Sequence, residues 1–226
     1  MAHDWDLIIF DCDGVLIDSE LLSAEVLIDL LAADGVEIDF DHVRRNFLGR
    51  SFPTVARHIR EELGHALAPD FDALYRARLL ERFETELRPM PGIASALEML
   101  AMRGVPVCVA TSSSPPRVAR SLDIVGLATA LPHVFTASQV ARGKPAPDLF
   151  LLAARTLGAE PSRCLVFEDS LPGLEAAQAA EMTAVRYTGG SHLTQAKLRH
   201  HPSLPILADW ADLPSILNRL RPEAVR

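Results

Sequence analysis

The 226-residue sequence has little cysteine, no excess of positive charge and no long apolar run, and each shortage excludes a class of protein. Its three cysteines are odd in number and lack metal-type spacing, so we expect reduced core thiols rather than a disulfide framework or a zinc site. The net charge of -8 argues against a nucleic-acid surface, which normally carries a basic field. No apolar run approaches the length of a membrane span and no charged leader precedes one, so the expected location is the cytoplasm.

What the sequence does contain is apolar residues, at 49% of the chain, enough for a sizeable core. Short apolar runs recur, and amphipathic stretches of helical period separate them. Several runs are apolar throughout, as expected for strands that are covered on both faces. The pattern predicts an α/β fold with an open, mostly parallel sheet and helices on both faces. The expected strands lie in "DLIIFD", "VPVCVAT", "VFTA", "CLVFED", "AVRYTG" and "PILAD".

One interval breaks the alternation of strands and helices. Between about Ser19 and Leu87 only helical periodicity is present, and the interval closes on "RPMPG", where Pro89 and Pro91 end the helix. We therefore predict a helical cap at 19–87, inserted into a catalytic core made of 1–18 and 88–226.

The first strand ends in "FDCD", which places Asp11 and Asp13 two residues apart and so on one face. Two like charges at such close range repel, and each raises the pKa of the other. The pair costs stability unless a cation or a reaction uses it. The other ligands of such a cation should follow the other strands.

Polar side chains do follow those strands, at the edge where open parallel sheets bind ligands. "ATSSS" supplies Thr111 and Ser112, "ARGKPAPD" supplies Lys144, and "CLVFEDS" supplies Glu168 and Asp169. Singly, each is as well explained as a helix cap, a surface charge or a turn residue. Together they describe a site for phosphoryl transfer, with carboxylates for Mg²⁺ and with hydroxyl groups and a lysine for a phosphate. A carboxylate can attack phosphorus and form an aspartyl-phosphate.

These motifs resemble those of the haloacid dehalogenase-like superfamily, and the match covers almost the whole chain. "DCDGVLIDSE" is similar to its first motif, "VATSS" to its second, "GKPAPD" to its third and "FEDSLPGLEAA" to its fourth. The resemblance implies a Rossmann-like core with a helical cap inserted after the first motif. It implies that Asp11 is the nucleophile and Asp13 an acid/base, which we expect its neighbour to hold protonated.

The resemblance also implies the remaining ligands. Asp11, Asp169 and Asp13, the last through its backbone carbonyl, would hold Mg²⁺, and Glu168 would be an outer-sphere or occasional ligand. The phosphate would be bound by Thr111, Lys144 and, less centrally, Ser112.

Within the family, the motifs are most similar to the sugar-phosphatase and β-phosphoglucomutase branch. Mutases of this branch carry a cap histidine where this chain has Ser23, and a Lys-Asn pair where it has Ser114 and Pro115. Both departures favour hydrolysis, with the mutase as the alternative. Dehalogenases lack the counterpart of Asp13, and phosphonatases need a cap lysine, which residues 19–87 do not contain.

The cap loop "NFLGRSFPTV" is the expected specificity element, with Gly49 for a tight turn and Arg50 and Ser51 reaching the cleft. Arg50 suits a carboxylate or a second phosphate, which favours an acidic sugar phosphate such as 6-phosphogluconate. Equally, Arg50 is one of several surface arginines of the cap. The histidines of "YTGGSHLTQAKLRHH" match no standard metal site, and we predict a surface loop there.

The expected partner is thus a small phosphorylated molecule, with no nucleic acid or membrane, for a protein that is a monomer or a weak dimer. An alternative from another class is a non-enzymatic phospho-acceptor domain, which also combines aspartates, a hydroxyl group and a lysine. Such domains are about half this length, lack a helical insertion and have no acid next to the acceptor. Asp13 favours turnover.

Overall fold

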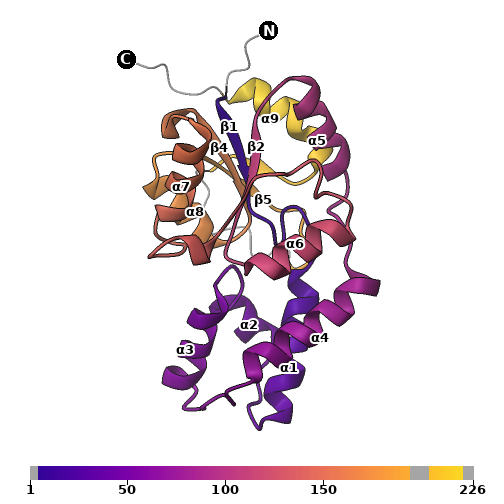
Figure 1. The fold of residues 1–226 in the computed structure, drawn as a ribbon, viewed down its shortest axis with the longest axis vertical. Helices are drawn as coiled ribbons and strands as arrows, with labels where there is room; N and C mark the ends of the chain where they lie inside the picture. Colours follow the sequence, from indigo (N-terminus) through magenta and orange to yellow (C-terminus); the bar gives the residue numbers. More distant parts are fainter. Residues whose placement is uncertain (1–4, 194–203, 221–226) are drawn as a thin grey trace.

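A parallel sheet forms the centre of the computed structural model, which describes residues 5–193 and 204–220. Its strands run in the order β3-β2-β1-β4-β5-β6, as Figure 1 shows in part. Their bounds are β1 Leu7–Phe10, β2 Val107–Thr111, β3 Val134–Thr136, β4 Cys164–Glu168, β5 Thr183–Tyr187 and β6 Ile206–Leu207. Five of them lie within the apolar runs predicted to hold strands, and β5 begins one residue before its run, at Thr183, so the predicted α/β fold is confirmed.

Helices cover both faces of the sheet because β1 is apolar on both. Ile8 and Phe10 belong to one core cluster, and Leu7 and Ile9 belong to the other. In Figure 1, α7 and α8 lie on one side of the sheet, and α5 and α9 lie on the other. These helices are α5 Ile93–Met102, α7 Asp148–Leu157, α8 Leu171–Ala179 and α9 Leu213–Arg219.

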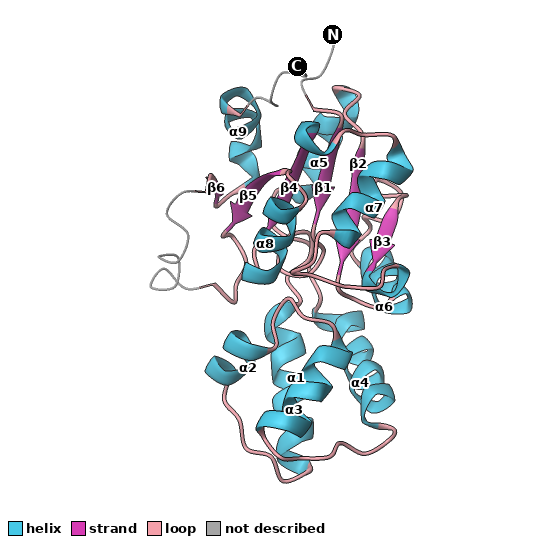
Figure 2. Ribbon diagram, turned by 90° about the vertical axis from the view of Figure 1, so that its left-hand side faces the viewer, coloured by secondary structure: helices cyan, strands magenta, loops and turns pink. Residues whose placement is uncertain are grey.

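The register of the strands gathers their carboxyl ends at one edge. Phe10, the last residue of β1, pairs with Val109 of β2 and with Phe167 of β4. The next residues, Asp11 just after β1 and Glu168 at the end of β4, therefore emerge side by side. This edge faces the helical region in Figures 1 and 2.

Four helices between β1 and α5 gather beyond that edge, away from the sheet (Figure 2). They are α1 Glu20–Ala33, α2 Phe40–Asn46, α3 Phe52–Glu62 and α4 Phe71–Glu86. Helical periodicity predicts three of them and misses α2, which has seven residues and buries Val43 alone. The start of α2 is fixed by an N-cap residue instead, since the Asp39 side chain accepts a hydrogen bond from the His42 backbone N–H at 2.7 Å. The division at 19–87 stays a prediction.

Two chain segments connect these helices to the sheet, and they lie together. Ile17 forms an isolated bridge with Pro89, and the Asp18 N–H donates to the Arg88 carbonyl at 3.0 Å. Gly14, at the turn leaving β1, has a φ of 77°, a conformation that glycine adopts without strain.

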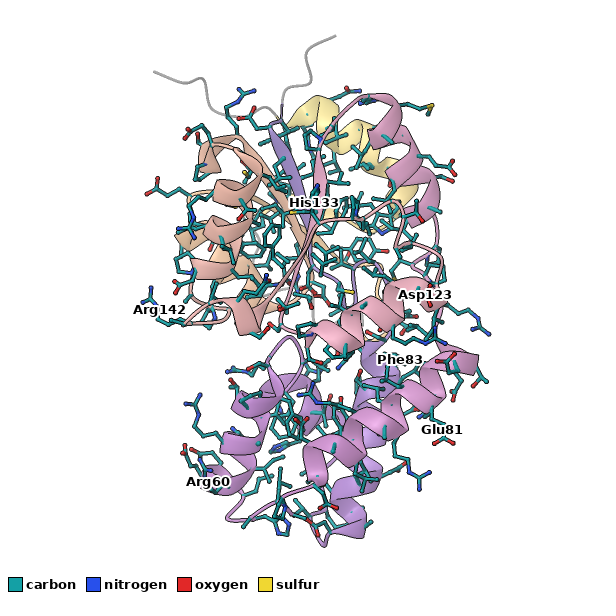
Figure 3. All side chains as sticks on the ribbon, in the orientation of Figure 1. Arg60, Glu81, Phe83, Asp123, His133 and Arg142 are labelled. Atoms are coloured by element: carbon teal, nitrogen blue, oxygen red, sulfur yellow. The ribbon has the colours of Figure 1, made fainter. Side chains whose placement is uncertain are left out.

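The helical region also docks on α6 Pro115–Ile124 of the core. The Arg120 guanidinium of α6 binds both Glu84 carboxylate oxygens of α4, at 2.8 and 2.7 Å. Nearby, the Arg117 guanidinium lies 5.5 Å from the centre of the Phe83 ring, which Figure 3 labels on α4. Within residues 5–193 and 204–220, no helix has the length and apolar character that a membrane crossing requires.

Candidate active site

Asp11 follows β1 directly and is buried, with 6% of its surface exposed. Its backbone N–H donates to the Phe167 carbonyl at 3.0 Å, which continues the pairing with β4 past the last strand residue. Its Oδ1 lies 2.6 Å from the Nζ of Lys144. The backbone therefore holds the expected nucleophile at a fixed place, with a cation against one of its oxygens.

Lys144 comes from the loop before α7 and is the cation at the centre of this group. Its Nζ also donates to Glu168 Oε1 at 2.7 Å and to the Ala110 carbonyl at 2.9 Å, and 1% of its side chain is exposed. Burial opposes the charge of Lys144, but the carboxylates of Asp11 and Glu168 outweigh it and raise its pKa. The ammonium is thus a permanent charge at the position predicted for binding a phosphate.

Three buried carboxylates form an acidic cluster, made of Asp11, Glu168 and Asp169, with ligand oxygens all within 4.8 Å of one another. Burial raises the pKa values of Asp11 and Asp169 well above the usual range, and repulsion from Glu168 adds to both shifts. Hard carboxylate oxygens at this spacing suit Mg²⁺, and its charge would relieve the repulsion. The cluster fits the predicted metal.

Asp13 has different surroundings, although it is only two residues from Asp11. Its Oδ1 accepts from the Arg117 guanidinium at 2.6 Å and from Ser19 Oγ at 2.5 Å, and its Oδ2 accepts from Ser113 Oγ at 2.6 Å. Burial favours the neutral acid, but Arg117 and the two serine hydroxyls outweigh it and lower the pKa of Asp13. Our expectation that the neighbouring carboxylate raises the pKa of Asp13 is wrong for this structure, because a guanidinium and two hydroxyl groups, rather than a second carboxylate, bind it.

Thr111 and Ser112 lie at the carboxyl end of β2, as predicted, and both line a cavity between the sheet edge and the helical region. Thr111 is buried, and its hydroxyl oxygen accepts a hydrogen bond from the Ser113 N–H at 3.0 Å. Ser112 Oγ donates to the Gly49 carbonyl at 3.2 Å. The β2 end therefore contacts the cap loop directly.

The cavity has a volume of about 280 Å³, and Gly49, Arg50 and Ser51 of the cap loop line it. Gly49 approaches the core so closely that an added Cβ would lie 2.5 Å from the Cβ of Ser170. Arg50 is exposed, and Ser51 Oγ lies 3.1 Å from Thr54 Oγ1. The three predicted cap residues thus border the same cavity as Asp11 and Asp13.

Arg117 is a functional candidate that sequence reasoning missed. It is the third residue of α6, after two prolines that start the helix, and it bridges Asp13 to Ser23 Oγ at 3.0 Å. Ser19 was missed as well, since its hydroxyl turns to Asp13 instead of capping α1, which it precedes. A hydroxyl-rich stretch followed by an arginine was visible in "SSSPPR", but nothing local connects it to a residue 104 positions away.

His192 is the clearest correction to the sequence analysis. We predicted a surface loop, but His192 is 4% exposed and its Nε2 lies 2.9 Å from Asp169 Oδ2. No spacing rule could detect this, because the histidine contacts a single carboxylate and is not one of a set of metal ligands. His200 and His201 lie outside the described residues.

Comparison with known proteins places these features in a family. The family model described as haloacid dehalogenase-like hydrolase matches residues 5–181. A putative phosphatase, YhcW of Bacillus subtilis, is 33% identical over 79% of this chain and 81% of its own length. The 6-phosphogluconate phosphatase of Escherichia coli is 24% identical over 93% of this chain and 94% of its own length. A crystal structure of CbbY from Rhodobacter sphaeroides, in complex with xylulose-(1,5)-bisphosphate, is 25% identical with a TM-score of 0.79, covering 92% and 96%.

Proposed function

Because this chain belongs to the haloacid dehalogenase-like hydrolases and is a phosphatase of that family, we propose that it hydrolyses small sugar or sugar-acid phosphates with the help of Mg²⁺. The single observation that carries this proposal is the contact of Asp11 with Lys144, inside the cluster completed by Glu168 and Asp169. A nucleophilic carboxylate, a fixed cation and oxygen ligands for a metal are the groups that phosphoryl transfer requires.

In the first half of the reaction, an Asp11 carboxylate oxygen attacks phosphorus while the bond to the leaving oxygen breaks. The product is an aspartyl-phosphate and an alcohol, whose oxygen takes a proton from Asp13. In the second half, the Asp13 carboxylate removes a proton from the water that attacks phosphorus, and inorganic phosphate and free Asp11 result. The ionised Asp13 that Arg117, Ser113 and Ser19 stabilise is the form which this second half uses.

The metal would be held by Asp11, Asp169 and the backbone carbonyl of Asp13, with Glu168 beside them. When bound, it would offset the repulsion between the nucleophile and the phosphate. Lys144 contributes a second positive charge, and Thr111 and Ser112 offer hydrogen-bond donors at the neighbouring strand end. The helical region covers this charge and excludes bulk water while the intermediate forms.

The cap residues that line the cavity support a class of substrate. Arg50 lines it and offers a planar fork that binds carboxylates and phosphates bidentately. The relative named as a 6-phosphogluconate phosphatase acts on a substrate with such a group, which supports a sugar-acid phosphate for this chain.

A hexose-phosphate mutase is the second candidate, because β-phosphoglucomutases share the fold. Hydrolysis is favoured because the position of the cap histidine is occupied by Ser23, which accepts a hydrogen bond from Arg117 in this structure. The Lys-Asn pair that mutases carry after the second motif is replaced here by Ser114 and Pro115, and Pro115 begins α6. The family match and the phosphatase relatives do not support the phospho-acceptor alternative.

The test is phosphate release from a panel of substrates, with Mg²⁺ and with EDTA. The panel holds hexose 1- and 6-phosphates, 6-phosphogluconate, phosphoglycolate and an aryl phosphate, and Asp11→Asn is the control. We expect Mg²⁺-dependent release that disappears in Asp11→Asn. Interconversion of hexose phosphates upon addition of a bisphosphate, without release, would establish the mutase instead.

A further inference from the structure

His192 and Asp169 form a buried pair on the metal side of the site. Both side chains are 3% exposed, and the Nε2–Oδ2 distance of 2.9 Å is that of a hydrogen bond. At this distance an Nε2–H of the imidazole can donate only to the Asp169 carboxylate, which is an acceptor.

The other ring nitrogen of His192 makes no hydrogen bond to the described residues. This nitrogen, Nδ1, is also buried. A buried polar atom without a partner costs on the order of 1–3 kcal/mol. A histidine that served only to fill the core would gain by satisfying both nitrogens, so the contact to Asp169 is the one that determines its placement.

Two glycines leave the space that the imidazole occupies. A Cβ on Gly190 would lie 2.7 Å from Cε1 and 2.9 Å from Nδ1 of His192. A Cβ on Gly14 would lie 2.8 Å from the same Cε1 and 2.1 Å from Asp169 Oδ2. The ring and the carboxylate are therefore packed against backbone on two sides.

The residue before His192 fixes this segment to the connection between sheet and cap. Ser191 donates from its Oγ at 2.7 Å and from its N–H at 3.3 Å to Asp18 Oδ1. Asp18 in turn is hydrogen-bonded to Arg88 in the second connecting segment. The imidazole is thus held by its own loop, by Gly14 and by the chain that leads into the cap.

We propose that His192 is a positioning residue, which orients the Asp169 carboxylate for the divalent cation through the Nε2–Oδ2 hydrogen bond. The inference rests on the proposed function, because it gives Asp169 a metal to bind. Partners that hold a ligating group in place typically change metal affinity by about 10- to 100-fold when removed.

The experiment measures metal binding directly, by electron paramagnetic resonance of Mn²⁺ and its displacement by Mg²⁺. His192→Leu removes the donor, and His192→Gln restores an N–H near the place of Nε2. Gly190→Ala keeps the histidine but displaces its ring, since Gly190 has a backbone conformation open to alanine. His133→Leu, at an exposed position before β3, is the matched control (Figure 3).

We expect the Kd for the metal to rise about 10- to 100-fold in His192→Leu and in Gly190→Ala. It should stay within a few-fold of wild type in His192→Gln and be unchanged in His133→Leu. The Mg²⁺ concentration for half-maximal phosphate release should rise in parallel, while kcat at saturating Mg²⁺ changes less. If His192→Leu does not fold, Gly190→Ala and His192→Gln decide the matter.

Equal affinity of wild type and Gly190→Ala, or loss of affinity in His192→Gln as great as in His192→Leu, would overturn the positioning role and leave the proposed function intact. A wild-type protein that binds neither Mn²⁺ nor Mg²⁺ would overturn both. Thermal unfolding of each variant in EDTA separates a loss of metal affinity from a loss of the fold.

Discussion

The two sides of the site are built differently, although two residues separate the aspartates at their centres. On the metal side, Asp11 faces Lys144 and the carboxylates of Glu168 and Asp169, all from the core. On the cap side, Asp13 is held by hydroxyl groups and by Arg117, whose helix carries the docked cap. Burial raises the pKa of Asp11, whereas Arg117 and the serines outweigh burial and lower the pKa of Asp13.

The difference shows how one strand end supplies two kinds of carboxylate. The surroundings of Asp11 leave it short of positive charge, which a bound cation supplies. Asp13 already has its cation, and its ionised form is stable without a metal. Environment, not residue type, assigns the two roles.

The largest expected effect comes from the metal side. Lys144→Met leaves Asp11 and Glu168 without their shared ammonium, so we expect phosphate release to fall by about 10²- to 10³-fold. Lys144→Arg keeps the charge but not the fit, and it should retain more activity than the methionine variant. Steady-state kinetics with circular dichroism as the folding check measure this, and activity near wild type in Lys144→Met would refute the role.

On the cap side, Arg117→Leu should lower kcat/KM by about 10- to 100-fold, because Asp13 loses the partner that fixes its carboxylate. Arg117→Lys should recover part of the loss. Arg120→Leu is the control, since Arg120 lies on the same helix and binds Glu84 rather than Asp13. Equal losses in the Arg117 and Arg120 variants would mean that docking of the cap, not Asp13, explains the effect.

A smaller effect is expected at the cap loop. Arg50→Ala should reduce the preference for 6-phosphogluconate over a neutral hexose 6-phosphate by about tenfold, mainly through KM. Arg57→Ala, which changes an exposed arginine of α3 outside the cavity that Arg50 lines, should leave the preference unchanged. Unchanged preference in Arg50→Ala would remove the basis for an acidic substrate.

The smallest effect on turnover is expected at Glu20, where pH and stability are coupled. Burial, followed by repulsion from Asp13, raises its pKa to about 8 from 4.5. The folded state then binds more protons than the unfolded state between these values, so this group lowers the free energy of unfolding as pH rises, by at most about 1.4 kcal/mol per pH unit. Denaturant unfolding in EDTA should show that the free energy of unfolding of Glu20→Gln rises relative to that of wild type from pH 5 to 8. A difference between the two proteins that stays constant over this range would contradict the raised pKa.

The sequence predicts the groups at the strand ends well, but it does not predict two of the side chains that bind them, Arg117 and His192. Asp11, Lys144 and Asp169 follow apolar strands or lie in a stiff loop, and parallel register brings such ends to one edge whatever the loops do. Arg117 meets Asp13, and His192 meets Asp169, only when α6 and the loop after β5 are folded against the strand ends, across 104 and 23 positions. Local patterns of hydrophobic periodicity and charge do not reveal such long-range pairs. A seven-residue helix such as α2 is too short for its hydrophobic periodicity to be detected.

The absence of a side chain at Gly49 allows the cap loop to pack directly against Ser170 of the core. A methyl group at position 49 would collide with Ser170, and Ser112 is hydrogen-bonded to the Gly49 carbonyl, so the loop lies closer to the core than a residue with a side chain would allow. A side chain at position 49 would therefore hold the cap loop away from the core and widen the cavity that Gly49 lines.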